Sequence, residues 1–291
     1  MKRIWSDVIL LHKGQKTSYT LLQLSHRLEK GLLIKNPKPM WGWDKAYLME
    51  KLLKRCENDF STITANAVLS AYLDAKSKSE FMEDREKYNV FLHTTGYQTI
   101  SYEGLGGTQI VQAPLFSSQE QHQIQRLFFT RHSCREFAKR PVSNEDLTKA
   151  IEMALRCPSA CNRQPFRIYA IAPEKLAEKL GRDHLQYSGD RSLIITGDVR
   201  AFTTNEMLDW IVSPSIFAGY LTLSLHSLGI GSCVVRKDLV NESTYNLAIR
   251  TITGMDESEQ IILELFIGYY KDEFEVPFSN RAKAESIITF I

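Results

Sequence analysis

The chain has 291 residues, of which 43% are hydrophobic and 24% charged, so it can bury a sizeable core in one large domain or two smaller ones. The formal net charge is +2 with both signs interspersed, and the chain therefore lacks the basic field on which nucleic-acid binding depends. An apolar run at 8–11 is too short for a signal peptide, and no long apolar span follows. We expect no nucleic-acid partner, no membrane partner and a cytoplasmic location.

The cysteines indicate free thiols. An odd number in a reducing compartment argues against a disulfide framework. A metal site at Cys157 and Cys161 beside His132 is conceivable, but no second Cys or His pair stands at zinc-site spacing, and we predict no metal. The five cysteines are Cys56, Cys134, Cys157, Cys161 and Cys233.

Amphipathic patterns predict an all-helical region over residues 1–93, with helices at about 17–30, 44–56, 61–76 and 80–92. In the first helix, Leu21, Leu24 and Leu28 form the inward stripe, Thr17 or Ser18 is the expected cap, and Gly31 is the expected left-handed end. In the second, the residues expected to face inward are Tyr47, Leu48, Leu52 and Cys56.

A second face of the first helix carries His26, Glu29 and Lys30 at i, i+3 and i+4. Such a face is typical of a solvated helix surface. Alternatively, two cations and a carboxylate on one patch could orient a polar or anionic substrate. The sequence leaves both interpretations open.

Residues 94–117 are rich in Gly, Thr, Ser and Gln, with a glycine cluster at 104–107. No Gly-Lys-Ser/Thr follows the cluster and no strand pattern precedes it, so a phosphate-binding loop is disfavoured. We predict a linker over 94–117 that joins the helical region to a second domain over 118–291.

The second domain alternates helices and strands. A capping box of Ser118 with Gln121 predicts a helix that buries Ile124, Leu127 and Phe128. Strands are expected at 166–171, 192–196, 232–235 and 261–269, and a strand-like tail at 285–290. The remaining helices are expected at about 143–155, 174–180, 214–228 and 242–251, the third of them apolar nearly all round. Strands with mixed spacing predict an α+β layered sheet.

Two motifs flank the helix at 143–155. The first, Arg131-His-Ser-Cys-Arg135, offers the cations and hydroxyl that suit a phosphate and a ribityl chain. The second, Cys157-Pro-Ser-Ala-Cys-Asn-Arg-Gln-Pro-Phe166, is a turn, because prolines disfavour helix on the residues before them. Its Ser159, Asn162 and Gln164 carry groups that could hydrogen-bond a heteroaromatic ring. Together they indicate a flavin site in two halves.

In order and spacing, the two motifs resemble those of the FMN-dependent nitroreductase family. The resemblance implies a three-layer fold with a mixed central sheet and an intertwined homodimer with FMN at the interface. It implies phosphate and ribityl contacts from the first motif and from a C-terminal arginine, ring contacts from the turn, and the end of the third strand beside the ring. Carried over to this sequence, these residues are Arg131, His132, Ser133, Arg135 and Arg281, then Pro158, Ser159, Asn162 and Gln164, then Val235 and Arg236.

The sequence departs from the family pattern in three places: Ser279 stands where some relatives carry a second cation, and Cys157 and Cys161 stand where Ala or Ser is more usual. The run 25–31 resembles an N-terminal segment of some nitroreductase-like proteins encoded near polysaccharide genes. For Arg131 and Arg135, the alternative interpretation is a surface pair bound to Glu136 or Asp146.

The resemblance implies that NADH or NADPH reduces the flavin and that hydride then passes through N5 to an unidentified small-molecule acceptor. No Gly-x-Gly-x-x-Gly follows a strand, and no catalytic acid or base is identifiable. The stretch 199–213, which covers the flavin in relatives, is short here, so residues 1–93 are a candidate lid. The alternative is a flavin-binding partner or assembly module with little turnover, in polysaccharide biosynthesis. The apolar helix and the tail at 286–290 predict an obligate homodimer.

Overall fold

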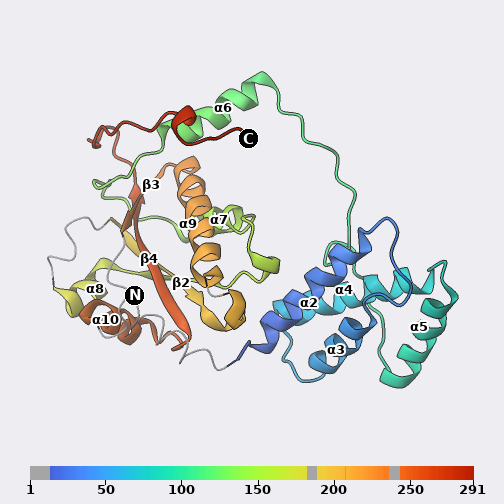
Figure 1. Ribbon diagram of the computed structural model, residues 1–291. Coiled ribbons are helices and arrows are strands. Elements are labelled where there is room, and N and C mark those ends of the chain that lie inside the picture. Colours follow the sequence, from blue (N-terminus) through green and yellow to red (C-terminus); the bar gives the residue numbers. More distant parts are fainter. Residues whose placement is uncertain (1–13, 182–188, 207, 236–242) are drawn as a thin grey trace.

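The computed structural model describes residues 14–181, 189–206, 208–235 and 243–291 (Figure 1). Four helices gather on one side: α2 (Thr17–Leu32), α3 (Trp43–Leu53), α4 (Phe60–Ser77) and α5 (Met82–Thr95). The sheet and the other helices lie on the other side, and a long extended connection joins the two parts. We call α2–α5 the helical region. None of the helices described is long and apolar enough to cross a membrane.

The helical region has its own core, in which the predicted stripe of α2 is confirmed. Leu21, Leu24 and Leu28 are all buried against α3, α4 and α5. On α3 the predicted stripe is wrong in part: Leu48 is 43% exposed, while Trp43, Ala46 and Met49 are buried. Tyr47, Leu52 and Cys56 only pack against the edge of the core. The buried set of α3 is thus shifted around the helix, because Trp43 packs against aromatic rings of α4 and α5.

The ends of α2 also differ from expectation. Its N-cap is Lys16, with no side-chain cap, and the helix runs through Gly31 to Leu32. Gly31 is therefore not a left-handed terminus. A Cβ on Gly31 would lie 1.6 Å from the ring of Trp41, so the glycine is required for close approach of that ring rather than for a turn.

Residues 96–117 form neither helix nor strand. The first part of this stretch is attached to α4: Tyr102 donates to Asp74 at 3.0 Å, and the Ile100 N–H donates to Ser70 at 3.0 Å. Gly106 and Gly107 lie so close to α4 that a Cβ on either would clash. Residues 108–117, which we call the strap, are exposed throughout and cross open space to α6 (Ser118–Thr130) (Figure 1).

The sheet has the order β1-β2-β4-β3, with every neighbouring pair antiparallel. Its strands are β1 (Phe166–Ile171), β2 (Arg191–Asp198), β3 (Ile230–Val235) and β4 (Glu259–Tyr269). A mixed sheet was expected, but the four strands pair only in antiparallel fashion. The parallel pairing among the residues described is the isolated bridge between Ser133 and Ser232. The α+β class is confirmed.

Helices cover both faces of the sheet. One core joins the sheet to α7 (Asn144–Ala154) and α9 (Asp209–Ser227), and another joins it to α8 (Pro173–Leu180) and α10 (Thr244–Thr253). The predicted strands and these four helices are present with shifted ends. Helix α9 begins ahead of Pro214, which lies inside it; burial of Trp210 and Phe217 offsets the hydrogen bond that the proline cannot make.

Two predictions for the ends of this region are wrong. The capping box of α6 is Ser117 with Glu120, one residue earlier than expected. No residue of α6 is buried, and Phe128 is 58% exposed. The tail forms a short 3-10 helix, Ala284–Ser286, instead of a strand, and Phe290 is 88% exposed. Among the residues that the structure describes, nothing covers these apolar side chains.

Helix α2 joins the helical region to the rest of the chain. Tyr19 and Leu22 are buried with Val199, Phe202 and Trp210 in one cluster. The chain just before α2 is also fixed there, because the Lys16 N–H donates to the Arg200 carbonyl at 3.0 Å. The helical region is therefore not fully separate, because it shares this core with the rest of the chain.

This shared core yields a stability prediction. Leu22→Ala removes buried methyl groups and should lower the free energy of unfolding by about 2–4 kcal/mol, measured by denaturant titration. Arg27→Ala, on the exposed face of the same helix, is the control and should change it by less than about 0.5 kcal/mol. Equal effects of the two variants would contradict the shared core.

Candidate functional site

The Arg131–Arg135 segment is held against the β3 edge of the sheet. It follows α6, and the Cys134 N–H donates to the Ser232 carbonyl at 2.9 Å. Gly231 permits this approach, because a Cβ there would lie 2.9 Å from Cβ of Cys134. The backbone of the segment is thus positioned by the sheet, with alternate side chains free to face away from it.

This segment and the C-terminal stretch line one cavity of about 480 Å³. The lining includes Arg131, His132, Ser133 and Arg135 from the segment and Arg281 from the C-terminal stretch. Several cationic side chains and a hydroxyl in one cavity are the donor set that a phosphomonoester requires. The remaining lining residues are Phe128, Phe129, Val276, Pro277, Phe278 and Ser279.

The acidic residues that the alternative interpretation assigned to these arginines have other partners. Glu136 pairs with Lys271 at 2.6 Å. Asp146 accepts a short hydrogen bond from Tyr269, and this bond holds the pKa of Asp146 below its ordinary value. Each of the two carboxylates is thus held by a residue outside the cavity lining.

His226, which the sequence analysis did not single out, lies beside Thr130, the residue that precedes the cationic segment. One ring nitrogen of His226 is 2.9 Å from the Thr130 hydroxyl, and the other is 2.9 Å from the Tyr270 hydroxyl. Burial, followed by the charges of Arg131 and His132, lowers the pKa of His226. A neutral imidazole thus ties the end of α6 to the end of β4, next to the cationic segment.

The second motif forms a strained turn between α7 and β1. Cys161, Asn162 and Gln164 have φ of 50°, 50° and 47°, in the left-handed region that non-glycine residues rarely adopt. Each such residue costs on the order of 1 kcal/mol or more, and strain of this kind concentrates at functional sites. The Gln164 N–H donates to the Ser159 hydroxyl at 3.2 Å, which helps to hold the turn closed.

Arg163, which sequence reasoning passed over, holds the turn from inside. Its side chain is 1% exposed and donates to the Ala160 carbonyl at 3.0 Å and the Ala201 carbonyl at 2.7 Å. It also binds Glu206 through two nitrogens, at 3.0 and 2.5 Å, and this contact lowers the pKa of Glu206 to about 2. In the sequence, Arg163 stands between Asn162 and Gln164, and nothing in that pattern distinguishes it from an exposed turn residue.

The two motifs lie at diagonally opposite corners of the sheet. Ser133 is beside β3 at the level of Ile267, whereas the turn enters β1 at Phe166, at the level of Gln260. Four spacings separate the two motifs across the sheet, because the first motif lies one spacing beyond β3; this distance is about 19 Å, and the seven residues from 260 to 267 add about 23 Å along the strands. Within one chain, the two predicted halves are therefore about 30 Å apart.

The other predicted residues are placed as follows. Val235 ends β3, is half-buried, and pairs with Glu264. Arg236 lies outside the described residues. Pro158 is exposed, at the start of the turn.

The predicted substrate face of α2 lies at a junction rather than entirely in solvent. His26 is half-buried, and burial, Lys30 and Arg163 lower its pKa. Burial raises the pKa of Glu29, which lies beside the Gly107 N–H. Lys30 is exposed. Because α2 contacts the turn, the helical region does not pack away from it. The role of these three side chains stays a prediction.

The thiols give no support to thiol or metal chemistry. Burial raises the pKa of Cys134, Cys157 and Cys233, which disfavours the reactive thiolate. Among the residues described, all five cysteines are free, and no group of three or more metal-binding side chains occurs.

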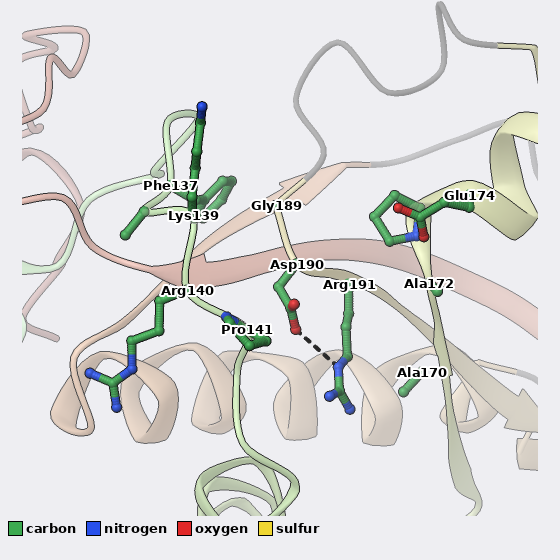
Figure 2. Close-up of a pocket in the computed structure, with 12 residues that line it drawn as sticks. Phe137, Lys139, Arg140, Pro141, Ala170, Ala172, Glu174, Gly189, Asp190 and Arg191 are labelled. Carbon is green, nitrogen blue, oxygen red and sulfur yellow. Dashed lines mark hydrogen bonds and ion pairs between the residues drawn. The ribbon is translucent and has the colours of Figure 1, made fainter.

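A larger cavity of about 630 Å³ lies after the first motif, between residues 137–141 and the end of β1 (Figure 2). Its arginines have structural partners: Arg191 bonds Asp190 at 3.0 Å and Asn144 at 2.7 Å, and Arg140 lies over the Tyr269 ring at 4.1 Å. None of the predicted site residues lines it. We therefore place the candidate site in the smaller cationic cavity and the turn.

Comparison with known proteins identifies a family that this part of the chain resembles. Residues 129–186, which contain both motifs, match the model of the nitroreductase family. The resemblance to the nitroreductase family is confirmed. This chain is also 24% identical, over 152 residues, to an Archaeoglobus fulgidus protein named as a candidate NADH dehydrogenase/NAD(P)H nitroreductase; the match covers 51% of this chain and 86% of that protein.

A solved structure shows the same fold for part of this chain. A candidate nitroreductase of Bacillus subtilis superposes with a TM-score of 0.50 at 19% identity, over 59% of this chain and 100% of that one. A Clostridium difficile protein named an FMN-dependent nitroreductase gives a TM-score of 0.45 at 23% identity, over 56% of this chain and 96% of that one. The fold likeness thus leaves about two fifths of this chain without a counterpart in the Bacillus subtilis structure.

Proposed function

We propose that this protein is an FMN-dependent NAD(P)H oxidoreductase of the nitroreductase type, with a small-molecule acceptor. The observation that carries the proposal is the meeting of Arg281 with the Arg131–Arg135 segment in one cavity. These cations come from stretches far apart in the sequence, and the motif resemblance assigns both to one phosphate. The residues present fit FMN, because the cavity offers charged donors and a hydroxyl.

When bound, FMN supplies the hydride chemistry, and the protein binds and orients it. Arg131, Arg135 and Arg281 hold the phosphate, with His132 beside them, and Ser133 reaches the ribityl chain. The second motif presents Ser159, Asn162 and Gln164 to the ring. No side chain is assigned as a catalytic acid or base.

The turn is suited to this task because its shape is fixed before any ligand arrives. The Arg163 guanidinium donates hydrogen bonds to two backbone carbonyls and to Glu206. These bonds hold the strained backbone of the turn in place. Preorganised donors lose little entropy on binding. A binding turn that is already ordered therefore favours tight retention of the cofactor.

The site is completed by a second copy of the chain. One copy supplies the cationic cavity and the other supplies the turn, since the two lie about 30 Å apart in one chain. The uncovered apolar side chains of α6 and of the tail, Phe128 and Phe290 among them, give such a homodimer its contact surface.

The function is tested by the absorbance of the purified protein. We expect a bound flavin spectrum that bleaches when NADH or NADPH is added without oxygen. Bound flavin that never bleaches would favour the alternative, a flavin-binding module with little turnover. Colourless protein that FMN does not reconstitute would exclude both.

The phosphate contacts are tested by Arg131→Ala. Loss of one charge-assisted contact costs about 1.5–3 kcal/mol, so the FMN dissociation constant should rise about ten- to a hundredfold, measured by flavin fluorescence after dialysis. Lys175→Ala, an exposed cation on α8, is the matched control. Stoichiometric flavin in both variants would refute the assignment.

The two-copy site is tested by complementation. Arg131→Ala lacks one half, and the double change Asn162→Gly with Gln164→Gly lacks the other without straining the backbone, since both positions have positive φ. Each variant alone should bind FMN weakly. Mixed after dissociation, they should regain about a quarter of the sites, because half of the random dimers carry one intact site each. No recovery in a mixture shown to form dimers would mean that each copy builds its site alone.

A further inference from the structure

His226 connects the two stretches of chain that line the cationic cavity, although it is not itself a lining residue. It belongs to the last turn of α9. Its Nε2 is 2.9 Å from the Thr130 hydroxyl, and Thr130 directly precedes Arg131. Its Nδ1 is 2.9 Å from the Tyr270 hydroxyl, at the start of the stretch that leads to Arg281. Any effect of this imidazole on a ligand in the cavity must therefore pass through these two stretches.

The hydrogen bonds around the ring determine which nitrogen carries its proton. Thr130 has one hydroxyl hydrogen, and it donates that hydrogen to the Arg126 carbonyl at 2.7 Å. The Thr130 oxygen can therefore only accept from the ring, so Nε2 is the protonated nitrogen. Nδ1 then accepts from the Tyr270 O–H. Burial, followed by two nearby positive charges, lowers the pKa of His226, which favours this neutral form.

The Tyr270 ring extends this connection into the C-terminal stretch. The ring meets the imidazole edge to face, with centroids 5.6 Å apart, and stacks on Phe274 with centroids 5.0 Å apart and planes 19° from parallel. Phe274 stands two residues before Val276, where the C-terminal part of the cavity lining begins. The Tyr270 N–H donates to the Gly229 carbonyl at 3.2 Å, which fixes the backbone beneath the ring. The imidazole thus sets the position of one lining stretch relative to the other.

A phosphate needs its donors at a fixed separation, because hydrogen bonds weaken steeply as distance and angle depart from their optimum. In this cavity, Arg131 and Arg281 come from stretches far apart in the sequence. We propose that His226 is a positioning residue for the cofactor phosphate: by bonding Thr130 and Tyr270 at once, it sets the separation between the two stretches that carry these arginines. The inference rests on the proposed function, which puts the FMN phosphate in this cavity; it adds a residue outside the lining to those on which phosphate binding depends.

The experiment compares FMN with riboflavin, which is the same molecule without the phosphate. Fluorescence quenching gives the dissociation constant of each for the full-length protein freed of flavin. His226→Ala removes both hydrogen bonds and should raise the FMN constant about tenfold, while the riboflavin constant changes less than about twofold. His226→Gln, whose amide again offers one donor and one acceptor, should bring the FMN constant to within about threefold of wild type. His93→Ala, at an exposed histidine of α5, is the control and should change neither constant.

Two further measurements address the hydrogen bonds themselves. Tyr270→Phe keeps the stacked ring and removes one bond. It should raise the FMN constant about threefold by itself and not at all in the His226→Ala background, because the bond is already absent there. The ring ¹⁵N–¹H spectrum at neutral pH, with the His226 signals identified by their loss in His226→Gln, should show a protonated Nε2 and an unprotonated Nδ1. A proton on Nδ1 would overturn the proposal, because the bonds to Thr130 and Tyr270 would then differ from those described.

The riboflavin measurement separates positioning of the phosphate from a general loosening of the fold. Equal weakening of FMN and riboflavin binding in His226→Ala would overturn the proposal, as would unchanged FMN binding. The proposed function is tested separately by Arg131→Ala. Weaker FMN binding in Arg131→Ala but not in His226→Ala removes this inference alone, whereas FMN binding that neither variant changes removes the phosphate assignment as well. These binding measurements do not depend on whether NADH or NADPH reduces the flavin.

Discussion

The buried contact between Arg163 and Glu206 is the interaction on which the site depends. It fixes a turn in which Cys161, Asn162 and Gln164 adopt left-handed backbone at a combined cost of several kcal/mol. The same guanidinium lies over the Phe202 ring at 4.5 Å, and Phe202 packs against α2. One side chain thus connects the strained turn to the core that attaches the helical region.

The sheet explains why the two motifs lie far apart within one chain. The cationic segment is held beside β3, and the turn leads into β1, so the two motifs lie at opposite edges of the sheet. Antiparallel strands carry the two motifs to opposite ends as well as opposite edges. In the homodimer proposed above, a two-fold arrangement would bring the two motifs together and generate two equivalent sites from one interface.

The sequence predicted the order of helices and strands well, since long apolar periodicities identify elements with little help from tertiary contacts. The motifs were found because proline, serine and amide residues stood at a recognisable spacing. Arg163 was missed because burial of an arginine depends on Glu206 and Ala201, some forty residues away in the chain. Gly31 was misread for a similar reason: it serves the approach of Trp41, which no local pattern reveals. The predicted burial of the apolar face of α6 was wrong, because amphipathicity identifies an apolar face but does not identify what packs against it.

The strap tethers the helical region covalently to α6. Its ten residues, 108–117, span at most about 33 Å when extended. Separation of α2 from the turn would therefore be an intramolecular opening, and reclosure would occur at the millimolar effective concentration that short linkers impose. The rate and extent of that opening would not change when the protein is diluted, in contrast to any contact that a second copy provides.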